Sequence, residues 1–85
     1  MVLHSHEHGL DFSIRGGSEH GLPIVVSFIK SNSATSKTEL RVGAEILKIN
    51  GVLLHQCKHA EAVRLLTESE TLELVFRRNT LFESK

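Results

Sequence analysis

The sequence of 85 residues has few cysteine, proline and aromatic residues, and its positive and negative charges balance. Its single cysteine cannot form an internal disulfide, and a lone thiol is typical of a reducing compartment. The ten basic and ten acidic residues cancel, so no net positive charge attracts nucleic acid or anionic lipid. Tryptophan and tyrosine are absent, which removes the side chains most used for base stacking and membrane-interface belts. These absences argue against nucleic-acid binding and direct membrane insertion, and nothing indicates a cofactor.

Long apolar runs are also missing. None approaches the ~20 residues of a membrane-spanning helix, and the first residues lack the basic and apolar regions of a signal peptide. The 40% hydrophobic and 24% charged content is that of a globular chain. We therefore expect a single small domain over residues 1–85, with its core at about 8–78 and mobile ends at 1–7 and 79–85.

Alternation of apolar and polar residues with a period of two predicts several β-strands. It is clearest at Leu10, Phe12 and Ile14, which interleave with polar side chains. Further strands are expected over residues 24–29, 46–49, 52–54 and 72–76.

A change of period predicts two helices. The helical spacing i, i+3, i+4, i+7 is met by His59, Ala62, Val63 and Leu66. This pattern predicts a helix over residues 58–67, although Lys58 stands where a capping Ser, Thr, Asp or Asn is preferred. A shorter helix is expected within residues 34–40. The predicted fold is mainly β with two helices, a small antiparallel β-sandwich or partly open barrel.

Four segments in a fixed order carry a resemblance to a known family. They are His8–Gly17 (HGLDFSIRGG), Leu40–Gly43 (LRVG), Ile46–Gly51 (ILKING) and His59–Val63 (HAEAV). In this order and spacing they resemble a PDZ domain over residues 8–78, and residues 12–21 resemble most the PDZ modules of the whirlin and harmonin group of scaffolds. The resemblance implies a PDZ-like fold and a binding module without catalysis. No strand–turn–helix nucleophile motif argues otherwise.

PDZ domains are a standard example of peptide capture by β-strand addition. The resemblance therefore implies a scaffold or adaptor module that binds C-terminal tails of membrane or scaffold proteins, with the end sequence Ser/Thr-X-apolar. It further implies a cytoplasmic location at membrane- or cytoskeleton-associated complexes, as a monomer or weak dimer.

The same resemblance assigns the site residues. The loop that binds the peptide carboxylate would be formed by Gly9, Leu10, Asp11 and Phe12. The peptide groove would be lined by Ser13, Ile14, His59, Val63 and Leu66. His59 would hydrogen-bond a Ser or Thr hydroxyl two residues before the C-terminus.

One departure from the family pattern leaves a second function open. Asp11 stands where the family usually has glycine, and its charge would oppose an incoming carboxylate. The alternative is an architectural module that pairs or dimerises through its edge strand, with weakened carboxylate binding.

Three alternating histidines near the N-terminus are the weak candidates for a metal site. On an extended segment His4, His6 and His8 would share one face, as zinc or nickel ligands can. Solvated histidines are the simpler interpretation, and we expect no metal.

Overall fold

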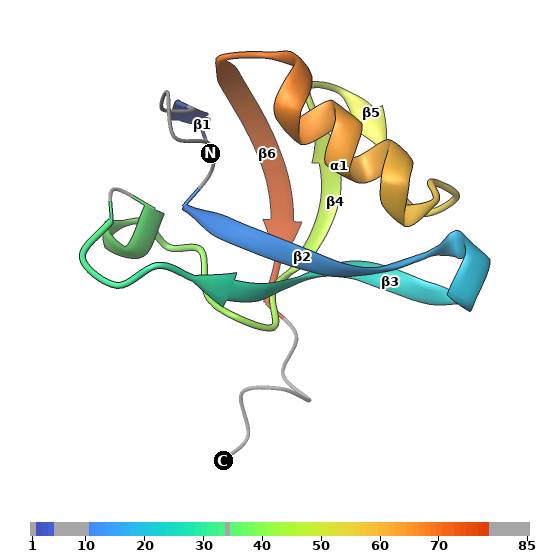
Figure 1. The fold of residues 1–85 in the computed structure, drawn as a ribbon, viewed down its shortest axis with the longest axis horizontal. Helices are drawn as coiled ribbons and strands as arrows, with labels where there is room; N and C mark the ends of the chain where they lie inside the picture. The colour runs from blue at the N-terminus through green and yellow to red at the C-terminus, as the bar shows by residue number, and fades with distance from the viewer. Residues whose placement is uncertain (1, 5–10, 34, 79–85) are drawn as a thin grey trace.

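The computed structural model describes residues 2–4, 11–33 and 35–78 (Figure 1). Its strands are β1 (Val2–His4), β2 (Phe12–Gly17), β3 (Leu22–Ile29), β4 (Glu45–Ile49), β5 (Val52–Leu53) and β6 (Thr71–Arg77). The α-helix is α1 (His59–Glu68), and the two 3-10 turns are η1 (Ser18–His20) and η2 (Thr35–Lys37).

The strands form one antiparallel sheet in the order β1-β6-β4-β3-β2, with β5 paired to β4. Figure 1 shows β2 and β3 crossing the direction of β4 and β6, so that the sheet curls around a core with α1 against it. This is the predicted small, mainly β architecture. The order leaves β2 at one edge, beside α1.

The core is built from the apolar positions of the predicted periodic patterns. On β6, Leu72 and Leu74 are buried while the alternate residues Glu73 and Val75 are exposed, as a half-buried strand requires. The helix contributes Ala62 and Leu66 to the same core. The remaining buried members are mainly Ile24, Val26, Leu40, Ile46, Ile49 and Leu54.

The predicted second helix is only a single 3-10 turn and not an α-helix. Within residues 34–40 the structure describes only the single 3-10 turn η2. The Ser33 hydroxyl accepts from the Ser36 backbone N–H at 3.1 Å, and the Thr38 hydroxyl donates to the Thr35 carbonyl at 2.7 Å. Serine and threonine side chains that bond to nearby backbone in this way compete with helical hydrogen bonds. The described part of the chain therefore has one α-helix.

The start of the chain also differs from the expectation of a mobile end over residues 1–7. Residues 2–4 form β1 and pair with β6, with Leu3 opposite Leu72. The alternation of only three residues is too short to predict a strand, and the pairing depends on a partner about seventy residues away.

Substitutions at two neighbouring residues of β6 test how strongly burial of a side chain contributes to the free energy of unfolding. Replacing the buried Leu74 by alanine should lower the free energy of unfolding by ~2–5 kcal/mol, since it leaves a cavity in the core. Replacing Val75, which is 46% exposed, should cost less than ~1 kcal/mol. Urea denaturation of both variants measures the difference, and equal losses would contradict this burial pattern.

Candidate functional site

A groove runs between β2 and α1. Among the described residues β2 pairs only with β3, so its other edge is available to a new strand. Figure 1 shows α1 beside this edge. The space between them is a cavity of about 310 Å³, which is lined by Phe12, Ser13, Ile14, His59, Val63, Leu66 and Thr67.

The groove has an apolar floor and one polar end. Phe12 and Leu66 are only 5% and 3% exposed, so they form the floor. Ile14 is half-buried and Val63 is 38% exposed, as expected for side chains on the walls. His59 lies at the first residue of α1. The arrangement suits an extended peptide with one buried apolar side chain and one hydroxyl.

Six of the nine residues assigned from the sequence line this groove together: Phe12, Ser13, Ile14, His59, Val63 and Leu66. Asp11 comes directly before β2, and its carbonyl accepts from the Lys30 backbone N–H at 2.7 Å. Gly9 and Leu10 lie outside the described residues. The assigned carboxylate loop is therefore described only at Asp11 and Phe12.

The orientation of the His59 ring follows from one hydrogen bond. Its Nδ1 lies 2.9 Å from the carbonyl oxygen of Gly16. Because a carbonyl oxygen can only accept, Nδ1 must carry the hydrogen. In the neutral ring Nε2 then holds a lone pair, so it can accept a hydrogen bond from a hydroxyl.

Two more hydrogen bonds join η1 to residues at the start of α1. The Ser18 backbone N–H donates to the Cys57 carbonyl at 2.9 Å, and the His59 backbone N–H donates to Glu19 Oε1 at 3.0 Å. Together with the bond from His59 to Gly16, these form what we call the turn–helix contact, between residues 16–19 and 57–59. It fixes one end of the groove.

The turn–helix contact lowers the pKa of the Glu19 carboxyl group. The N–H of His59, which donates to it, holds the pKa of Glu19 below its usual range, and the backbone N–H of Glu19 itself acts in the same direction. A carboxyl with a lowered folded-state pKa stabilises the fold above its unfolded-state pKa. That contribution is lost as the pH falls through the folded-state value.

Gly17 allows the turn and the helix to approach so closely. Its φ of +150° belongs to a region that glycine alone occupies readily. A β-carbon at this position would lie 2.6 Å from the His59 backbone nitrogen. A side chain here would push the start of α1 away from η1.

Sequence reasoning missed two residues of this region. Thr67 lines the groove, and its position four residues after Val63 on the same helical stripe could have indicated it. Glu19 had no comparable signal, because its contact with His59 spans 40 residues of sequence. The poor cap predicted at Lys58 is real, but Glu19 and Glu61 supply acceptors for the free N–H groups there.

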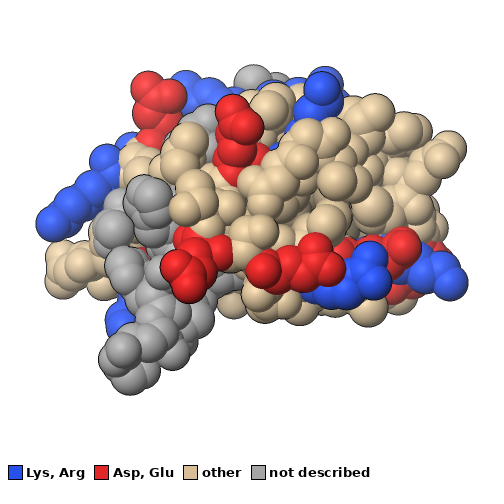
Figure 2. All heavy atoms as spheres, turned by 90° about the horizontal axis from the view of Figure 1, so that it is seen from above, with Lys and Arg blue, Asp and Glu red and all other residues tan. Residues whose placement is uncertain are grey.

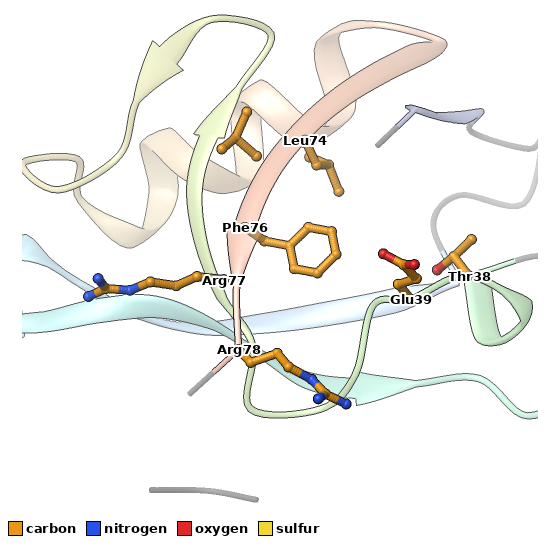
Figure 3. Close-up of a pocket in the computed structure, with 7 residues that line it drawn as sticks. Thr38, Glu39, Leu74, Phe76, Arg77 and Arg78 are labelled. Atoms are coloured by element: carbon orange, nitrogen blue, oxygen red, sulfur yellow. The ribbon is translucent and has the colours of Figure 1, made fainter. Parts of the chain in front are cut away.

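A larger hollow of about 730 Å³ lies on another part of the surface (Figure 3). Glu39 and Thr38 face Phe76 across it, whereas Arg77 points away and its Nη2 lies 2.9 Å from Glu45 Oε1. The strand beneath, β6, is paired on both sides by β1 and β4. It offers no free edge for strand addition, so we do not regard this hollow as the peptide site.

Neither the charges on the face drawn in Figure 2 nor the possible metal ligands among the described residues indicate another site. On the face drawn in Figure 2 acidic and basic side chains are interspersed, without a large field of one sign. Over the ranges that the structure describes, no three His, Cys, Asp or Glu residues gather as metal ligands. His4 lies in β1, while His6 and His8 fall outside these ranges. No helix in the same ranges is long and apolar enough to cross a membrane.

Comparison with known proteins agrees with this geometry. The chain is 51% identical over 70 residues to human whirlin, and 46% identical over 69 residues to mouse PDZ domain-containing protein 7. The matched parts are 82% and 81% of this chain but only 8% and 7% of those relatives. The chain therefore spans less than a tenth of the length of either.

A solved structure shares the fold. The second PDZ domain of Dlg1 from the choanoflagellate Monosiga brevicollis superimposes with a TM-score of 0.80 at 30% sequence identity, covering 93% of this chain and 96% of that one. The family model described as PDZ domain matches residues 1–77. With an edge strand, an adjoining helix and a groove between them, this chain is a member of the PDZ domain family.

Proposed function

We propose that this domain binds the C-terminal peptide of a partner protein by adding it as a strand to the open edge of β2. The observation that carries the proposal is the groove between an edge strand and a helix, with an apolar floor. An edge strand offers unpaired backbone groups, which supply affinity without regard to sequence. The domain acts by binding alone, as an interaction module of a scaffold or adaptor protein.

The floor of the groove supports a preference for an apolar last residue. Phe12 and Leu66 are almost fully buried, yet both line the cavity. An aliphatic side chain that enters there removes its own surface from water, at roughly 25 cal/mol per Å². The peptide carboxylate would then lie near the residues assigned to it from the sequence, Gly9, Leu10, Asp11 and Phe12.

His59 supports a preference for Ser or Thr two residues before the end. Leu66 is seven residues further along α1, which is about 10 Å at 1.5 Å per residue. A peptide strand advances about 3.3 Å per residue, so the separation of His59 and Leu66 corresponds to two to three peptide residues, a range that includes the side chain two before the end. The acceptor Nε2 of His59 would then face the hydroxyl of that side chain. The partners would be C-terminal tails of membrane or scaffold proteins in cytoplasmic, membrane- or cytoskeleton-associated complexes.

Amidation of the peptide end separates the two candidate functions. A free-acid peptide ending Thr-X-Val should bind at least ~10-fold more tightly than its C-terminal amide, since the amide loses a charge-assisted hydrogen-bond acceptor. Isothermal titration with both peptides measures the ratio. Equal affinities would instead support edge-strand pairing that needs no carboxylate.

Asp11 should weaken carboxylate binding by charge repulsion. Asp11→Asn keeps the shape of the side chain and removes its charge, so it should tighten binding by ~0.5–1.5 kcal/mol at low salt. The gain should shrink as salt rises. Asp11→Gly serves as the comparison that also frees the backbone. Weaker binding by Asp11→Asn would contradict this prediction and would show that the Asp11 carboxylate contacts the peptide favourably.

A double-mutant cycle tests the assignment of His59. His59→Ala in the domain and Thr→Ala in the peptide should show a coupling energy of ~0.5–1.5 kcal/mol, the net value of one hydrogen bond. The control is His55→Ala, an exposed histidine outside the groove. A coupling energy near zero for His59 would contradict the assignment.

A further inference from the structure

We propose that Glu19 is a positioning residue, which determines peptide specificity by holding the start of α1, and hence His59, in place beside β2. This inference rests on the proposed function, because His59 is the group through which Glu19 acts. Glu19 lies in η1, outside the lining of the groove, so it is not itself a residue that touches the peptide there.

The start of α1 takes one hydrogen-bond acceptor from elsewhere in the chain. A helix leaves its first N–H groups without partners inside the helix, and the N-cap residue Lys58 provides no side-chain cap. Glu61 accepts from the Lys58 backbone N–H at 2.9 Å, which satisfies one of them. The N–H of His59 itself is satisfied by Glu19 Oε1 at 3.0 Å.

His59 donates two hydrogen bonds to residues 16–19. The backbone of His59 is held by Glu19, while its ring is held by the Gly16 carbonyl at 2.9 Å. The third bond of the turn–helix contact joins the backbones of Ser18 and Cys57. Of the three, only the Glu19 bond uses a side chain from the turn, so it can be removed without altering His59.

The position of the start of α1 determines which tautomer the His59 imidazole adopts. While α1 begins close to Gly16, the ring donates from Nδ1 and keeps Nε2 free as an acceptor. Without Glu19 the first turn of α1 loses an anchor, and the ring loses its fixed distance to the Gly16 carbonyl. A neutral histidine released from that bond also populates the tautomer with hydrogen on Nε2, which cannot accept a hydroxyl.

The first measurement is the discrimination between two free-acid hexapeptides that end Thr-X-Val and Ala-X-Val. The wild-type domain should bind the Thr peptide about 5-fold more tightly, the effect of one hydrogen bond. In Glu19→Ala this ratio should fall below about 2-fold, while the affinity for the Ala peptide stays within about 2-fold of wild type. Glu19→Gln, whose amide oxygen can still accept from the His59 N–H, should restore the ratio.

The second measurement needs no peptide. Long-range proton–nitrogen NMR spectra at about pH 8 should show the Nδ1–H tautomer of His59 in the wild type and a mixture in Glu19→Ala. The matched control is Glu61→Ala, which removes a carboxylate from the same helix start but does not touch the turn. It should lower thermal stability without changing the tautomer or the ratio.

The outcomes separate the two proposals. An unchanged ratio and tautomer in Glu19→Ala, or equal effects of Glu19→Ala and Glu61→Ala, would overturn the positioning role. If the wild type does not distinguish the two peptides but the tautomer still depends on Glu19, hydroxyl recognition fails while the positioning of His59 stands. Should Glu19→Ala not fold, Glu19→Asp, whose carboxylate is one methylene shorter, should lower the ratio in the same way.

Discussion

The turn–helix contact sets the geometry on which the groove depends. A helix packed on a sheet can slide along it, because apolar contacts are not directional. Here hydrogen bonds from residues 16–19 fix where α1 begins, and Gly17 allows the close approach that those bonds require. The width of the groove and the direction of the His59 ring both follow from this contact. In the function we propose, the apolar floor would supply affinity and the contact would determine which peptide is recognised.

The charge distribution of this domain favours short-range over long-range interactions with a partner. The formal net charge is zero, and on the face of Figure 2 both signs are interspersed, so long-range attraction contributes little to finding a partner. In the function we propose, selectivity would come from hydrogen bonds and shape within the groove. The one charge that sequence reasoning places against a peptide carboxylate, on Asp11, would weaken binding rather than direct it.

The sequence predicts those parts of the structure that depend on periodicity. Alternation gives β2 and β6, and helical spacing gives α1 together with the stripe of His59, Val63 and Leu66 that faces the groove. It fails where side chains bond to nearby backbone, as Ser33 and Thr38 do around η2. It also fails where partners lie far apart in sequence. The pairing of β1 with β6 and the bond between Glu19 and His59 leave no local pattern to find.

The most direct test of the account is a crystal structure of the domain with a free-acid peptide ending Thr-X-Val. We expect the peptide to lie antiparallel to β2, with its last side chain on Phe12 and Leu66 and its threonine hydroxyl within hydrogen-bond distance of His59 Nε2. A peptide bound in the hollow beside Phe76, or a threonine hydroxyl turned away from His59, would contradict it.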